Sequence, residues 1–272
     1  MTGRIETYQV GEGYLYLAPG KRVSGNPRVE REVLSPSVTR PEVRRGRGTL
    51  IPIGGAATND NLQVVADHIA KDAPLTIFTT TTEIPEEQFT GYRERFAFVG
   101  VTAEQFHLGE HTIPEEGEAM FRLSEGAFIV GGDQRRGRVV LESLGFIQSL
   151  HEFYQAGKTV AGTSAGAHML GEITSYESEV ESGVGLAKGK SYESHANRRD
   201  GDVRQRDVVE RKDVVSFGFP EGAGLVDYRD GRVRVFGREV NLRWQYNGHQ
   251  ADQMLRVDQM VELWSLKRKY SK

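Results

Sequence analysis

The stretch Val160-Ala161-Gly162-Thr163-Ser164-Ala165-Gly166-Ala167-His168 places a serine among glycines and alanines, directly after an apolar run and directly before a helical pattern. A serine in this setting is typical of a sharp turn from a strand into a helix, which exposes the hydroxyl at the edge of the sheet. The neighbours must be small because such a turn leaves little room for side chains. The amide of Ala165 then points to where an oxyanion would form. An ordinary glycine-rich turn with an incidental serine is the alternative interpretation.

The composition limits the classes of protein to which the chain can belong. It has 272 residues, 38% of them hydrophobic, which is enough for one large core with an appendage. A formal net charge of -3 gives no reason to expect binding to nucleic acid or to a membrane surface. The absence of cysteine excludes disulfides, thiolate metal sites and a cysteine nucleophile. No apolar run can span a bilayer and no signal-peptide core is visible, so we expect a cytoplasmic protein.

Strand-like and helix-like segments alternate from residue 48 onward. Strands are expected at 49–53, 75–80, 103–108, 127–130 and 159–161, and helices at about 59–70, 87–98 and 138–156. This alternation predicts an α/β fold, a mostly parallel sheet flanked by helices. The carboxyl ends of parallel strands meet at one edge of such a sheet, which is where ligands bind. The glycine turns that follow three of these strands should therefore converge.

The two ends of the chain have different patterns. Residues 1–47 form an N-terminal extension, with short strands followed by a polar linker that is rich in arginine. Residues 48–272 are expected to form a single domain. Within it, turn signals in 214–242 predict peripheral β-hairpins that cover one edge, and residues 254–266 have the pattern of a closing helix.

A serine becomes a useful nucleophile only when a base accepts its proton and an acid orients that base. Among seven histidines, His195 is our choice of base, because it follows Ser164 in a charged segment that could fold back over the strand ends. His168, one helical turn after Ser164, and His249, near the carboxyl end, stay open as alternatives.

Three glutamates between Ser164 and His195 are candidates for the acid. Glu177, Glu179 and Glu181 alternate along one extended face. The resulting order of serine, acid and histidine is also that of α/β-hydrolases. At least two of the three glutamates must simply face solvent.

The segment Gly131-Gly132-Asp133-Gln134 follows another expected strand. One of its glycine amides could complete an oxyanion hole with Ala165, and Gln134 could bind a substrate amide or carboxylate. Arg199 and Arg204 could bind a substrate carboxylate with two parallel hydrogen bonds. A tight turn and solvated arginines are the alternative interpretations.

Three segments together resemble the cyanophycinase and dipeptidase E family of serine peptidases: 53–56 (Ile-Gly-Gly-Ala), 128–134 (Phe-Ile-Val-Gly-Gly-Asp-Gln) and 161–167 (Ala-Gly-Thr-Ser-Ala-Gly-Ala). Their order and approximate spacing match, and the resemblance covers about residues 48–242. It implies a three-layer, flavodoxin-like fold related to class I glutamine amidotransferases, with serine in place of their cysteine. Family members cleave peptide bonds beside aspartate. Cyanophycinases release β-aspartyl-arginine dipeptides from cyanophycin, and dipeptidase E members cleave after an amino-terminal aspartate.

The resemblance also implies roles for residues at the strand ends. Ser164 would be the nucleophile, and the amides of Gly132 and Ala165 would form the oxyanion hole. Asp133, Gln134 and Thr163 would lie at the substrate.

The resemblance further suggests the base and the acid. Tyr176-Glu177-Ser178-Glu179 resembles a family segment that ends in Ser-Glu, which makes Glu179 the acid. Glu193-Ser194-His195-Ala196 corresponds to the family's Asp-Gln-His-Phe, which makes His195 the base, with Arg199 and Arg204 after it. The chain departs from the family around His195, and the Leu-Pro-Gly that usually precedes this segment is missing.

The sequence therefore predicts a serine peptidase of this family with a Ser164-His195-Glu179 triad, an acyl-enzyme intermediate, no metal and no cofactor. Its expected substrate is a peptide or a polyaspartate-arginine polymer, and we expect a homodimer. The alternatives are a dipeptidase E-like aspartyl dipeptidase, a non-catalytic binding or assembly protein on the same fold, and an esterase or amidase of the wider hydrolase type.

Overall fold

The computed structural model describes residues 6–10, 13–17, 48–70, 72–102, 104–177, 179–198, 201–211, 214–246 and 249–263. In the N-terminal extension, β1 (Glu6–Val10) and β2 (Gly13–Leu17) pair as an antiparallel hairpin, in accord with the expected short strands. The polar linker predicted after them lies outside the described residues.

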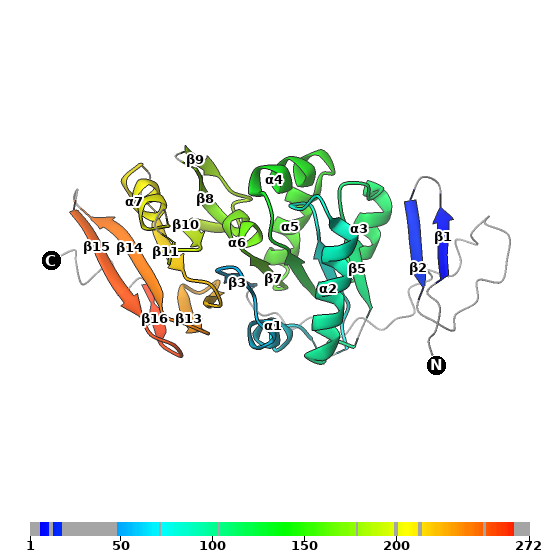
Figure 1. Ribbon diagram of the computed structural model, residues 1–272, viewed down its shortest axis with the longest axis horizontal. Helices are drawn as coiled ribbons and strands as arrows, with labels where there is room; N and C mark the ends of the chain where they lie inside the picture. The colour runs from blue at the N-terminus through cyan, green and yellow to red at the C-terminus, as the bar shows by residue number, and fades with distance from the viewer. Residues whose placement is uncertain are drawn as a thin grey trace.

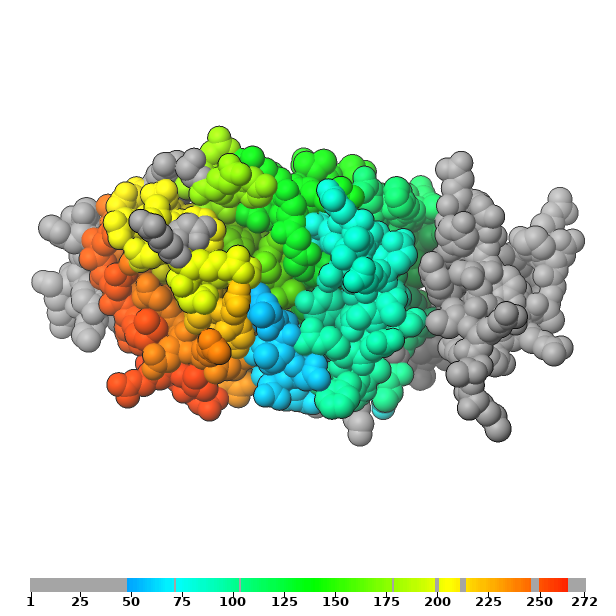
Figure 2. Space-filling model, viewed as in Figure 1, coloured from blue at the N-terminus to red at the C-terminus, as the bar shows by residue number. Residues whose placement is uncertain are grey.

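The main sheet has eight strands in the order β16-β13-β12-β3-β7-β6-β4-β5. Their bounds are β3 (Thr49–Ile53), β4 (Leu75–Phe78), β5 (Gln105–Leu108), β6 (Gly126–Ile129), β7 (Thr159–Thr163), β12 (Gly224–Tyr228), β13 (Arg232–Phe236) and β16 (Met260–Glu262). The strands β3 to β7 run parallel, and β12, β13 and β16 extend the sheet by antiparallel pairing. Figure 2 accordingly shows the orange segment of the C-terminal half beside the blue segment that begins near residue 48.

Helices cover both faces of this sheet because buried side chains alternate along its strands. Ile51, Phe128 and Ala161 pack on one side with α1 (Asn59–Ala66) and α2 (Pro85–Phe98). Leu50 and Val160 pack on the other side with α3 (Pro114–Leu123), α4 (Gln134–Ser143), α5 (Phe146–Gln155) and α6 (Ala165–Leu170). The predicted three-layer, flavodoxin-like α/β fold with a mostly parallel sheet is confirmed (Figure 1).

The structure has a second sheet in addition to the hairpins that were expected at 214–242. Its order is β15-β14-β11-β10-β8-β9, and its strands are β8 (Gly171–Tyr176), β9 (Glu179–Ser182), β10 (Ala187–Ser194), β11 (Val215–Phe219), β14 (Val240–Tyr246) and β15 (His249–Leu255). The helix α7 (Gly201–Arg211) connects β10 to β11. Tyr192, Phe217 and Leu242 join this sheet to the core that Leu50 and Val160 share. Within the described residues, no helix is long and apolar enough to cross a membrane.

The predictions of two helices are wrong. The helix expected at 138–156 is divided into α4 and α5, because Gly145 adopts a left-handed conformation with φ 76° that ends the helical path. The expected closing helix at 254–266 begins instead in β15 and continues in β16, and residues 264–272 lie outside the described part. Leu255 and Val261 are buried there as strand residues. A short apolar run does not distinguish a strand from a buried helical segment.

The aromatic packing under α2 gives a test of this core. Phe128 of β6 is fully buried, with its ring 4.8 Å from Tyr92 and 5.1 Å from Phe96 of α2. Phe128→Ala should lower the free energy of unfolding by about 3–5 kcal/mol in urea denaturation. The control is Phe98→Ala on α2, where the side chain is 78% exposed. This variant should change the free energy of unfolding by less than about 0.5 kcal/mol. Equal losses in the two variants would contradict the assignment of this face to the core.

Candidate active site

Ser164 lies in a strained turn between β7 and α6. Its φ of 52° and ψ of -117° are rare for a residue with a side chain. The glycines around it are required by close backbone packing. A Cβ on Gly162 would lie 2.5 Å from the carbonyl carbon of Gly166, and one on Gly166 would lie 2.2 Å from the carbonyl oxygen of Ile129. The structure thus has the expected elbow at the expected serine.

His195 lies directly after β10, with its side chain at the serine. The distance from Ser164 Oγ to His195 Nε2 is 2.9 Å. Of the alternatives, His168 is buried and uses Nε2 to accept a hydrogen bond from the Ser194 amide. The side chain of His249 lies outside the described part.

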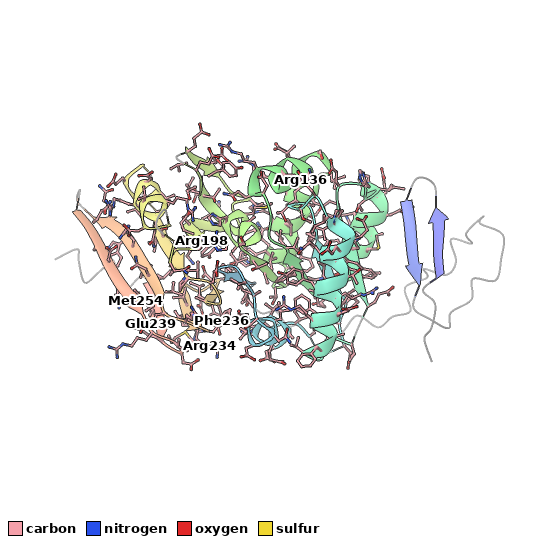
Figure 3. All side chains as sticks on the ribbon, viewed as in Figure 1. Arg136, Arg198, Arg234, Phe236, Glu239 and Met254 are labelled. Carbon is pink, nitrogen blue, oxygen red and sulfur yellow. The ribbon has the colours of Figure 1, made fainter. Side chains whose placement is uncertain are left out.

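The carboxylate beside His195 belongs to Glu221, which the sequence analysis did not single out. His195 Nδ1 lies 3.1 Å from Glu221 Oε1, and Arg198 Nη2 lies 2.7 Å from the same oxygen. Figure 3 labels Arg198 in this part of the molecule. Parallel pairing explains the meeting, because Ser194 of β10 is opposite Phe219 of β11. The residues that follow the two strands therefore emerge at the same sheet edge.

The expectation that Glu179 contacts the base is wrong in the structure. Glu179 lies on the edge strand β9, is 67% exposed, and pairs with Arg135 of α4. Glu181 also binds Arg135, with 2.6 Å between its Oε1 and Arg135 Nε, and Glu177 is exposed at the hairpin turn. Glu179 and Glu181 are on the extended strand β9, where they hold the β8-β9 hairpin to α4, whereas Glu177 has a φ of 53° in the turn and is not part of the expected extended face.

The charges around His195 favour a neutral imidazole. Burial lowers the pKa of His195, the positive charge of Arg198 lowers it further, and the bond to Glu221 partly offsets both. Hydrogen bonds from Arg198 and His195 lower the pKa of Glu221, so this carboxylate stays ionised. With the proton on Nδ1 directed at Glu221, His195 Nε2 has a lone pair available to the serine hydroxyl.

The segment around Gly54 and Gly55 lies against the His195 imidazole. It is the first of the three segments that resemble the cyanophycinase and dipeptidase E family. The carbonyl of Gly54 accepts a hydrogen bond from the His195 amide at 3.1 Å. Gly55 has a φ of 101°, and a Cβ there would lie 2.4 Å from His195 Cε1. Gly55 therefore makes room for the imidazole, a role that was not evident from the sequence.

The glycine pair after β6 passes beside the serine. A Cβ on Gly131 would lie 3.3 Å from the Ser164 Cβ. Gly132 has a φ of 144°, and its Cβ would lie 2.1 Å from the carbonyl oxygen of Thr81. Ala165 is the first residue of α6, a position whose amide has no partner within its own helix. Gly132 and Ala165 therefore lie on segments adjacent to Ser164, as the predicted oxyanion hole requires.

Asp133 and Gln134, expected at the substrate, have structural partners. Asp133 is the N-cap of α4, where its Oδ1 accepts two backbone amides at 2.7 and 3.1 Å. Its Oδ2 accepts a bond from the Tyr176 hydroxyl at 3.2 Å. Gln134 Nε2 donates to the Ser175 carbonyl at 2.6 Å, which connects α4 to β8. The Asp133 carboxylate therefore caps α4, and its contact with a substrate stays a prediction.

Two of the other expected substrate residues, Thr163 and Arg204, lie close to the serine or to the base. Thr163 is buried at the end of β7, next to Ser164. Arg204 of α7 donates to the Ser194 carbonyl at 3.0 Å, one residue before the base. Arg199 lies outside the described residues.

A cavity of about 550 Å³ adjoins the loops that carry His195 and Glu221. Ala196 and Asn197, which follow His195, form one wall with Pro220, which precedes Glu221. Glu239 and Met254, labelled in Figure 3, also line it. Ser164, His195 and Glu221 are not among its lining residues, so the cavity adjoins the loops of the base and the acid without including their side chains.

A half-buried serine on a strand-to-helix elbow, hydrogen-bonded to a histidine whose other nitrogen binds a carboxylate, is the arrangement of serine hydrolases. Comparison with known proteins finds cyanophycinases and peptidases. Two curated cyanophycinases, from Synechococcus elongatus and Thermosynechococcus vestitus, are each 26% identical to this chain over 245 residues. Each match covers 82% of this chain and 76% of the relative. No family model matches the chain.

Solved structures give the same result for the fold. A peptidase from an acI-B1 Actinobacterium matches 80% of this chain and 98% of its own, with a TM-score of 0.65 and 16% identity. A candidate peptidase E from Listeria monocytogenes matches 69% of this chain and 97% of its own, with a TM-score of 0.54 and 16% identity. The chain is a homologue of cyanophycinases with a peptidase E-like fold, which confirms the resemblance seen in its sequence.

The contact between Gly55 and the imidazole can be tested with a matched pair of glycines. Gly55 and Gly100 both have positive φ, 101° and 91°, but a Cβ on Gly100 would meet open space. Both alanine variants should lose about 1–2 kcal/mol of stability from backbone strain. Only Gly55→Ala should also slow the labelling of Ser164 by a fluorophosphonate, by about tenfold or more, because its methyl group displaces the imidazole. Equal labelling rates in the two variants would contradict this geometry.

The partner of His195 can be identified by NMR titration. In the wild type, the pKa of His195 should lie below 6.5, the ordinary value for histidine. The carboxylate of Glu221 raises this pKa, so Glu221→Gln should lower it further. Glu179→Gln, which removes the carboxylate bound to Arg135, should leave it unchanged. A shift in the Glu179 variant alone would restore the original assignment. The imidazole resonance of His195 is assigned as the one that is missing from the spectrum of His195→Ala.

Proposed function

We propose that this chain is a serine peptidase that hydrolyses amide bonds next to aspartyl units, through Ser164, His195 and Glu221. The observation that carries the proposal is the continuous series of hydrogen bonds, 2.9 Å from serine to histidine and 3.1 Å from histidine to glutamate, at a strained elbow. The homologous cyanophycinases support a peptidase of this family and suggest the aspartyl substrate class.

In the first half of the reaction, Ser164 Oγ attacks the carbonyl carbon of the scissile amide while its proton moves to His195 Nε2. The negative charge that develops on the substrate oxygen is stabilised by the amides of Gly132 and Ala165. Glu221 keeps the imidazole oriented and stabilises its protonated form. His195 then gives the proton to the leaving nitrogen as the C–N bond breaks, and an acyl ester remains on Ser164.

In the second half, water attacks the ester carbonyl and its proton moves to His195 Nε2. The C–O bond to Ser164 then breaks, and His195 returns the proton to the serine oxygen. The acid product leaves and the enzyme regains its starting state. The low pKa of His195 keeps the base neutral near neutral pH, as both proton-accepting steps need.

An aspartyl substrate brings a carboxylate that needs a positive partner. Arg204 is the best candidate within the described residues, because it contacts the Ser194 carbonyl and its charge lowers the pKa of His195. Arg199 stays a second candidate. Arg135 binds Glu179 and Glu181 at the β8-β9 hairpin. A planar guanidinium can bind a carboxylate through two hydrogen bonds. Such binding would make the site selective for both the charge and the position of the substrate carboxylate.

A non-catalytic binding protein on this fold is less well supported. That alternative was expected to lack a histidine near Ser164, whereas His195 lies at hydrogen-bond distance. No specific observation favours a general esterase over a peptidase.

The decisive experiment is hydrolysis of a substrate panel by the wild type and by Ser164→Ala. The panel contains cyanophycin, α-aspartyl and β-aspartyl dipeptides, neutral dipeptides and a simple ester. We expect cleavage of the aspartyl amides by the wild type and a loss on the order of 10⁶-fold in Ser164→Ala with an unchanged melting temperature. Ser143→Ala, on the exposed end of α4, is the control.

Full activity of Ser164→Ala would overturn the proposed function. Cleavage of the ester without cleavage of any aspartyl amide would instead favour the esterase alternative. Within the aspartyl substrates, a preference for the polymer or for dipeptides would distinguish cyanophycinase activity from aspartyl dipeptidase activity.

A further inference from the structure

The helix that begins after Ser164 carries a buried histidine that the proposed mechanism does not use. His168 of α6 is only 5% exposed and has a partner at each ring nitrogen. The Ser194 amide donates to His168 Nε2 at 2.9 Å, and Nδ1 lies 2.9 Å from Thr174 Oγ1. Because a backbone N–H can only donate, Nε2 carries no hydrogen. His168 is therefore neutral, and its hydrogen lies on Nδ1, directed at Thr174.

The peptide that His168 binds immediately precedes the base. His195 has a φ of 56°, a left-handed conformation that residues with side chains seldom adopt. Such a conformation persists where surrounding contacts determine it. Here the Ser194 amide is bound by His168, the Ser194 carbonyl by Arg204 at 3.0 Å, and the His195 amide by the Gly54 carbonyl at 3.1 Å. Of these contacts, the one from His168 comes from the nucleophile's own helix.

A buried carboxylate supports the required state of the ring. Glu193 is fully buried, and it accepts hydrogen bonds from the hydroxyls of Ser175 and Ser191. Its Oε2 lies 3.5 Å from His168 Nδ1. A carboxylate on this side favours the hydrogen on Nδ1, and this leaves Nε2 as the acceptor for Ser194. The two hydroxyls provide the hydrogen bonds that a buried carboxylate needs.

We propose that His168 is a positioning residue for the base: its Nε2 holds the Ser194 peptide and so sets the His195 imidazole at Ser164. This inference rests on the proposed function. The helix α6 carries the nucleophile at its start and this anchor four residues later, and the His168 amide donates to the Ser164 carbonyl at 3.1 Å. One short rigid element thus determines the separation of nucleophile and base. His168 cannot also be the base, because its acceptor nitrogen is already occupied.

Two substitutions separate the acceptor from the bulk of the ring. His168→Leu removes the acceptor, whereas His168→Gln keeps an oxygen that can accept the Ser194 amide. We expect His168→Leu to lower kcat and the rate of fluorophosphonate labelling by about 100-fold, with KM nearly unchanged, because the base is displaced and the substrate-binding segments are not. His168→Gln should recover at least about tenfold of that loss. His151→Gln is the matched control, since His151 binds only the Val184 carbonyl, at 2.8 Å, and should behave as wild type.

The outcomes are separable. Wild-type rates in a folded His168→Leu, or equal losses in the leucine and glutamine variants, would overturn the inference even if Ser164→Ala establishes the peptidase. If His168→Leu fails to fold, a measurement on the wild-type protein still tests the inference. The ¹⁵N spectrum of the wild-type imidazole should show a hydrogen on Nδ1 and none on Nε2, and the Ser194 amide should be protected from hydrogen exchange. A hydrogen on Nε2 would overturn the inference, whatever the activity.

Discussion

The close approach of α6 to the strands beneath it is the constraint on which the rest of the site depends. A Cβ on Gly166 would lie 2.2 Å from the Ile129 carbonyl oxygen, and one on Gly162 would lie 2.5 Å from Gly166 itself. Because no side chain separates helix and sheet, the chain turns from β7 into α6 at a single residue. That residue is Ser164, and its strained conformation presents the hydroxyl at the sheet edge. The close packing of these glycines therefore determines the position of Ser164.

The base and the acid come from the second sheet. Parallel pairing of β10 with β11 places the residues that follow these strands, His195 and Glu221, at the same edge. The two sheets are joined at this point by the bond from the His195 amide to the Gly54 carbonyl. The nucleophile is thus positioned by one sheet and its base and acid by the other. The geometry of the site depends on how the two sheets pack.

The boundary between what could and could not be predicted follows from this division. The parallel sheet, the elbow and Ser164 are encoded by local patterns, namely apolar runs, glycine turns and a helical period. Glu221 lies 57 residues after Ser164 in a plain Pro-Glu-Gly turn, and only the non-local pairing of β10 with β11 brings it to His195. Alternation along 177–181 indicated an extended segment that the structure has only from Glu179 onward, and it carries no information on which partner that strand meets. The partner is Arg135.

The divergence of the segment around His195 does not by itself indicate a lost activity. Glu193 and Ser194 stand where the family has Asp and Gln, yet the buried network of Glu193 with Ser175, Ser191 and His168 gives them new partners. Ser164 and His195 are both held at positive φ, and each such conformation costs about 1–3 kcal/mol. The side chains of these two strained residues meet at 2.9 Å. Backbone strain of this kind clusters at active sites.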